Sequence, residues 1–136
     1  MSETKATLLN FGLLWLRVMT GLGMAYHGYG KVFGGNMHKM AEGVAAMGFP
    51  APEFFAWAAA LSEFAGGILL ALGLFTRPAA LFILITMGVA AFIKHGADPF
   101  QKKELALAYF VAAGALALMG AGKYAFDTSI KCSCKK

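Results

Sequence analysis

Two ionisable residues lie deep inside long apolar stretches of this sequence, where a charge is costly. Arg17 interrupts the run LLNFGLLWLRVMTGLGMAYHGYGKV, and Glu63 is the only charge between Phe54 and Phe75. Inside a bilayer an arginine costs on the order of 2.5–3.5 kcal/mol, so each charge should have a partner. If the two stretches form an antiparallel hairpin, Arg17 faces about Gly66, one helical turn from Glu63. We therefore predict an Arg17–Glu63 pair, which is either a structural ion pair that fixes helix register or a site that handles protons or substrate.

A second group of titratable residues falls at the ends of the apolar stretches. His27 and Lys31 are four residues apart and so share one face of a helix, while His95 ends the third stretch and Glu104 opens the fourth. Antiparallel helices would bring all four to one side of the membrane. The simpler interpretation is that lysines reach the lipid headgroups and Glu104 caps a helix. The more specific one is a polar ligand pocket that opens to the outer face and is lined by Arg17, His27, Lys31, Glu63, His95 and Glu104.

Metal binding is a weaker prediction. Two histidines and a carboxylate can hold a metal ion, but His27, His95 and Glu104 come from three different elements. Cys132 and Cys134 are too few for a structural zinc site, and a disulfide between them would be strained. We therefore predict no metal site, with the two cysteines as weak candidates and a soft-metal or redox-relay site as the alternative. The sequence has no Walker loop, nucleophile triad or dinucleotide fingerprint, so it shows no self-contained catalytic motif.

The elements that position these residues are apolar enough to be membrane helices. The chain has 136 residues, enough for one domain, of which 59% are hydrophobic and 14% charged. A soluble domain typically has roughly 45–50% hydrophobic residues and about 25% charged residues. Runs such as AALFILITMGVAAFI lack the polar face that a helix of a soluble bundle shows. The net charge of +5 comes from basic residues at the ends of these runs and in the tail, which favours anchoring to anionic headgroups over nucleic-acid binding.

Four apolar stretches predict an all-α integral membrane protein, an antiparallel four-helix bundle over residues 1–127. Residues 128–136 form a basic polar tail with the sequence CSC. Six lysines and arginines on one side against five on the other favour, narrowly, both termini in the cytoplasm. The predicted spans are Leu8 to about Val32, Phe54 to Phe75, Ala79 to Ile93 and Leu105 to about Ala121.

The segments that connect the predicted spans also contain local patterns that predict structure. Thr76 can cap the third span, and Pro78 fits its first turn. Between the first two spans an apolar stripe at helical spacing predicts a short interfacial helix whose stripe contacts lipid or the bundle. This stripe consists of Met37, Met40, Val44 and Met47.

Several stretches resemble the DoxX family of membrane proteins. An arginine in LLWLRVMTGLGM is followed by HGYGKVFG, which matches a His-Gly-x-x-Lys pattern at His27, Gly28 and Lys31. The most specific stretch is MGFPAPEFFAWAAALSEFAGGILLALGLFTRPAAL, followed by the histidine after the third helix (His95), the glutamate that opens the fourth (Glu104) and a GAGKYAFD ending. Lysine 123 of that ending stands where arginine is common, and the CSC tail is outside the pattern.

The resemblance covers roughly Leu8 to Asp127 and implies a four-helix bundle in the bacterial cytoplasmic membrane. The family is similar to the membrane subunit of thiosulfate:quinone oxidoreductase, so the resemblance implies a quinone- or thiol-linked redox component without a covalently bound cofactor. The predicted pocket would then bind a quinone head group or a small anion. The alternatives are a small-molecule transporter that uses the same polar axis and a membrane scaffold for a soluble redox partner. Many small residues are compatible with a homo-oligomer.

Overall fold

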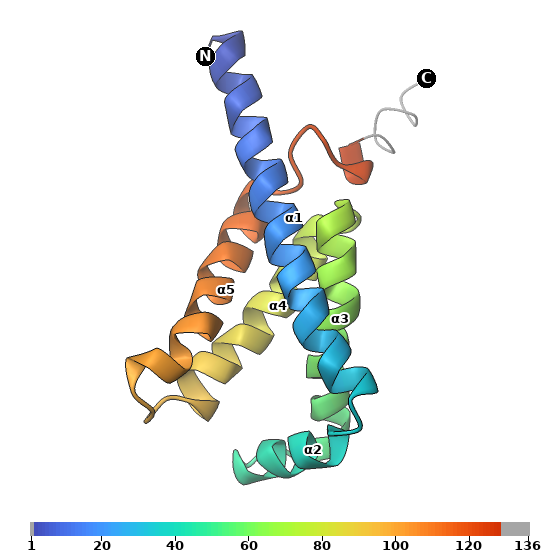
Figure 1. Ribbon diagram of the computed structural model, residues 1–136, viewed down its shortest axis with the longest axis vertical. Helices are drawn as coiled ribbons and strands as arrows, with labels where there is room; N and C mark the ends of the chain where they lie inside the picture. The colour runs from blue at the N-terminus through green and yellow to red at the C-terminus, as the bar shows by residue number, and fades with distance from the viewer. Residues whose placement is uncertain (1, 129–136) are drawn as a thin grey trace.

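The protein is all-helical over residues 2–128, the part of the chain that this computed structural model describes (Figure 1). Helix α1 lies beside α3, α4 lies beside α5, and α2 crosses one end of the bundle (Figure 1). A π-helix, η1, continues α4 without a break. The all-α prediction is confirmed. The elements are α1 (Glu3–Phe33), α2 (Met37–Ala46), α3 (Pro52–Leu72), α4 (Thr76–Gly88), η1 (Val89–Lys94) and α5 (Phe100–Met119).

Within residues 2–128, three helices are long and apolar enough to cross a membrane, namely α1, α3 and the continuous helix from Thr76 to Lys94. Large apolar side chains project from the bundle, as Trp15 (72% exposed) and Leu118 (82% exposed) show, and such a surface suits lipid rather than water. Helix α5 falls short of a full apolar crossing because charged residues occupy its start and leave only Leu105–Met119 uncharged. The predicted fourth span is therefore a helix, but a less apolar one than the other three.

Glycines set the contact between α1 and α3. A Cβ atom on Gly21 would lie 2.5 Å from the backbone N of Ala71, and one on Gly67 would lie 2.5 Å from that of Ala25. Backbones this close are typical of membrane helices that pack through small residues. These contacts also fix the register between the two helices, because they place Gly21 of α1 beside Ala71, near the end of α3.

Helix α2 packs its methionine stripe against α3. Ala41 and Val44 form a buried cluster with Ala56 of α3, and the side chains of Met37, Met40 and Met47 pack against it. The remaining face carries charged residues that are exposed, as expected for a helix at a membrane interface. The predicted short helix is confirmed, and its stripe contacts the bundle.

The segment after α5, residues 120–128, folds back onto the start of α4. Both oxygens of the Asp127 carboxylate accept backbone hydrogen bonds there, from Phe75 N–H at 2.8 Å and from Thr76 N–H at 2.9 Å. A carboxylate at a helix N-terminus satisfies unpaired donors and favours the helix dipole. The prediction that Thr76 caps this helix is wrong, because Asp127 takes that place and the buried Thr76 Oγ1 has no hydrogen-bond partner among the described residues.

Candidate ligand-binding site

The buried carboxylate of Glu63 pairs with Lys31. Lys31 Nζ lies 2.5 Å from Oε1 and 2.6 Å from Oε2 of Glu63, so one ammonium group serves both oxygens. Glu63 is 1% exposed and Lys31 is 39% exposed, which means that the pair reaches from the interior to the surface. The contact arises because Gly28, one turn before Lys31, packs directly against Phe64.

The predicted Arg17–Glu63 pair is wrong, and the helix register is the reason. The hairpin estimate placed Arg17 opposite Gly66, whereas the observed contacts place Gly21 opposite Gly67 and Ala71. Arg17 therefore lies farther along α3, where its guanidinium contacts Gly73. The structure separates the two charges and gives each a different partner.

Arg17 is satisfied by the C-terminal segment. Its side chain is 2% exposed, Nη1 donates to the carbonyl oxygen of Ala121 at 2.9 Å, and Nη2 donates to that of Tyr124 at 2.8 Å. Asp127 of the same segment interacts with the guanidinium electrostatically, while Nε finds no partner within residues 2–128. Two fixed carbonyls suit the planar fork of arginine. Arg17 thus ties α1 to the segment that caps α4, away from Glu63.

A pocket of about 350 Å³ opens beside the Lys31–Glu63 pair. Its volume lies in the range of about 300–1,000 Å³ that is usual for small-molecule sites. Ser62 and Thr86 contribute hydroxyls whose oxygens are 2.6 Å apart, and either one can be the donor. Lys39 of α2 and Lys94 of η1 add two ammonium groups, which form no ion pair among the described residues. The apolar lining includes Met40, Val44, Met47, Phe49, Phe55, Phe82, Ile85 and Val89.

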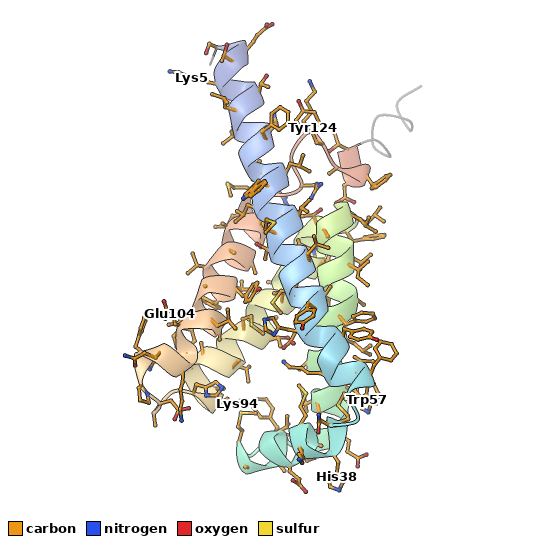
Figure 2. The ribbon with its side chains drawn as sticks, in the orientation of Figure 1. Lys5, His38, Trp57, Lys94, Glu104 and Tyr124 are labelled. Atoms are coloured by element: carbon orange, nitrogen blue, oxygen red, sulfur yellow. The ribbon has the colours of Figure 1, made fainter. Side chains whose placement is uncertain are left out.

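The π-helix η1 shapes one wall of this pocket. His95 N–H donates to the carbonyl oxygen of Ala90 at 3.0 Å, which is the spacing of five residues that defines a π-turn. Val89, Ala90 and Lys94 of this turn line the pocket. Figure 2 shows Lys94 at the end of the bundle nearest α2. Departures of this kind from α-helical geometry occur frequently at functional sites.

Of the six residues predicted to share a pocket, the structure brings together Lys31 and Glu63. His27 is exposed and lies edge-on to the ring of Tyr109 on α5, with ring centres 5.9 Å apart. Lys31 lies about 6 Å farther along α1 than His27 and is turned by about 40°, and it contacts α3 whereas His27 contacts α5. Glu104 lies on the outer side of α5, away from α2 (Figure 2). Arg17, His27, His95 and Glu104 do not line the pocket.

His95 has its partner in the loop that precedes α5. Its Nδ1 lies 2.7 Å from Oδ2 of Asp98. This hydrogen bond is the main reason that the pKa of Asp98 is lowered from its ordinary value, and Lys102 and Lys103 add to the effect. The arrangement fixes the loop between η1 and α5 rather than a ligand.

The described residues contain no group of three histidines, cysteines, aspartates or glutamates that could hold a metal ion. Cys132 and Cys134 lie outside the residues that the structure describes. Sequence reasoning missed four polar residues of the pocket, Lys39, Ser62, Thr86 and Lys94. Ser62 and Thr86 carry a signal in hindsight, because each is a hydroxyl within an otherwise apolar stretch.

Comparison with protein-family models matches residues 12–96 to the family described as DoxX. The matched region covers well over half of the chain and contains both Lys31 and Glu63. No curated protein and no solved structure matches the sequence.

Proposed function

This chain belongs to the DoxX family, and from that premise we propose that it is a component of a quinone- or thiol-linked redox system in the bacterial cytoplasmic membrane. In this proposal the pocket beside Lys31 and Glu63 binds a quinone head group. The three apolar helices make it a multi-pass membrane protein.

The proposed topology has four crossings, with α5 as the fourth and both termini in the cytoplasm. Helix α5 packs along α4 and runs antiparallel to it, so it would cross the membrane in the opposite sense (Figure 1). Lys102 and Lys103 stand near the start of α5, from where their long side chains can reach the headgroups. The shorter apolar part of α5 then spans the hydrocarbon core together with these flanking residues.

The observation that supports a quinone ligand is the position of the Lys31–Glu63 ion pair at the edge of a mostly apolar pocket. A quinone head group is an apolar ring with two oxygens that accept hydrogen bonds. Lys31 Nζ is a donor at the polar part of the pocket, and the methionine and phenylalanine side chains suit the ring. The hydroxyls of Ser62 and Thr86 donate here to the carbonyl oxygens of Ala59 and Phe82, and a hydroxyl can rotate to donate to a ligand instead. Phe82 and Ile85 line the pocket and are also exposed on the bundle surface, so an isoprenoid chain can pass between them into lipid.

The chemistry that this site would support is proton delivery. Reduction of a quinone to a quinol takes up two electrons and two protons, and a dithiol that becomes a disulfide releases the same number of each. A partner that carries such a dithiol would supply the electrons. Lys31 would donate a proton to a quinone oxygen from Nζ and regain one through its exposed part, while Glu63 holds the ammonium group in place.

A photoreactive quinone tests this proposal in bacterial membranes. We expect crosslinks to map to pocket residues of α2, α3 and α4, and the labelling to fall when Ser62 and Thr86 are replaced together by alanine and valine. This double variant leaves the Lys31–Glu63 pair intact and so avoids an unpaired buried charge. His27→Ala is the matched control, because His27 lies outside the pocket. Labelling that is spread over α5 and over the part of α1 before Lys31, or that is unchanged in the double variant, would contradict the proposal.

A further inference from the structure

A second cavity lies between α4 and α5, and we call it the α4–α5 groove. Its volume is about 630 Å³, and it shares only Phe82 with the pocket beside Glu63. Its other walls are Arg77, Pro78, Leu81 and Leu84 of α4 and Gly114, Ala117 and Leu118 of α5. Apart from one arginine, the side chains of the groove are apolar.

Small residues on α5 leave this groove open. A Cβ atom on Gly114 would meet only Leu84 Cδ1, at 3.5 Å, which is ordinary van der Waals distance. A larger side chain at this position would therefore be accommodated by the backbone and would occupy the groove. In a membrane, an apolar groove on the surface of a bundle is filled by an apolar chain.

Arg77 places a positive charge at one end of the groove. Its side chain is exposed, Nη2 lies 3.5 Å from the carbonyl oxygen of Leu118, and none of the ion pairs within residues 2–128 involves it. Arg77 is also the second residue of the membrane-crossing helix that runs from Thr76 to Lys94. If this helix crosses the membrane, the guanidinium lies at the end of the span and the apolar walls run from it toward the bilayer interior.

We propose that the α4–α5 groove binds an anionic phospholipid, with an acyl chain along Leu81, Leu84 and Gly114 and the phosphate at Arg77. A guanidinium presents a planar fork that matches the oxygens of a phosphate. An anionic lipid brings its negative charge without a compensating amine, so it matches a guanidinium that forms no ion pair within residues 2–128. This site is separate from the proposed quinone pocket, and neither proposal depends on the other.

Native mass spectrometry of the full chain tests the assignment. The protein in detergent is offered equal amounts of phosphatidylglycerol and phosphatidylcholine with identical acyl chains. We expect the wild type to retain phosphatidylglycerol preferentially, and Arg77→Gln to lower that preference about fivefold. Lys123→Gln removes a positive charge that does not line the groove and is expected to leave the preference unchanged.

Gly114→Leu tests the acyl-chain part of the site independently. This variant fills the groove and is expected to lose the retained lipid while keeping its helical content. Equal retention of both lipids by the wild type, or an unchanged preference in Arg77→Gln, would overturn the proposal. A lipid-free dimer that Gly114→Leu abolishes would also overturn it, because the groove would then hold a second copy of the chain.

Discussion

Lys31 Nζ lies within 2.6 Å of both carboxylate oxygens of Glu63, and this contact joins the last turn of α1 to the middle of α3. The two partners differ in access to water, since Glu63 is 1% exposed and Lys31 is 39% exposed. The difference makes the pair asymmetric. If Glu63 is lost, Lys31 can turn toward the surface, but if Lys31 is lost, a carboxylate is left buried.

This asymmetry gives the first prediction. Lys31→Met should destabilise the fold by about 3 kcal/mol, the low end of the range for a broken buried pair, because Lys31 is partly exposed. Glu63→Gln should cost less, and the double variant should recover stability relative to Lys31→Met alone. Loss of helical structure in a denaturing detergent titration measures the three differences. A larger loss for Glu63→Gln than for Lys31→Met would show that the carboxylate is not the buried partner.

The glycine contacts between α1 and α3 give the second prediction. Gly21→Ala should destabilise the bundle by about 1–3 kcal/mol, because the new Cβ would lie 2.5 Å from the backbone of Ala71. Gly12→Ala is the matched control on the same helix, since a Cβ there meets no atom within 4 Å. It should be neutral or stabilise by up to about 1 kcal/mol through helix propensity. Equal effects in the same titration would argue against the close helix contact.

The contacts between α1 and α3 also show which features of the structure could be predicted from the sequence. The apolar runs predicted the helices, and the methionine spacing predicted α2, because both depend on local periodicity. The partner of Glu63 depends instead on the register between α1 and α3. The backbone contacts at Gly21 and Gly67 set that register, and it cannot be counted from an assumed hairpin end. The hairpin estimate therefore named both buried charges correctly but paired them wrongly.

The pocket could not be predicted from the sequence for a similar reason. Lys94 comes to the pocket through a π-turn, and an α-helical periodicity does not anticipate that change of phase. Asp127 caps a helix that begins 51 residues earlier, at Thr76, and such a long-range cap has no local signature. The local Thr76-Arg77-Pro78 pattern suggested a cap by Thr76 instead.

The third prediction concerns Asp127 and the start of α4. Asp127→Asn keeps one acceptor oxygen but removes the negative charge, so stability should fall by about 1 kcal/mol. Amide hydrogen exchange should increase first at Phe75 and Thr76, whose N–H groups donate to this carboxylate. Lys123→Gln, on the same segment, should leave these two amides protected. Unchanged protection in Asp127→Asn would mean that its charge does not stabilise the helix start.

The fourth prediction follows the contact between His95 and Asp98. The pKa of Asp98 is lowered mainly by the hydrogen bond to His95, so His95→Ala should raise it toward the ordinary value. Lys102→Gln should raise it less. Because the pKa is lower in the folded protein, the stabilising contribution of Asp98 is present above its unfolded pKa and is lost as pH falls through the folded pKa. Carboxyl NMR titration of Asp98 measures the midpoint, and an unshifted midpoint in His95→Ala would refute the assigned cause.

The central claim is that the pocket beside Lys31 and Glu63 binds a quinone head group, and filling that pocket tests it most directly. A Cβ atom at Gly43 meets no atom within 4 Å, and Gly43 lines the pocket, so Gly43→Leu adds a large apolar side chain at the pocket wall and leaves both members of the ion pair in place. Gly12→Leu makes the same change in open space on α1. We predict that equilibrium binding of a short-chain quinone to the protein in lipid nanodiscs weakens about tenfold or more in Gly43→Leu and is unchanged in Gly12→Leu. Wild-type affinity in Gly43→Leu, or no quinone binding by the wild type, would contradict the claim.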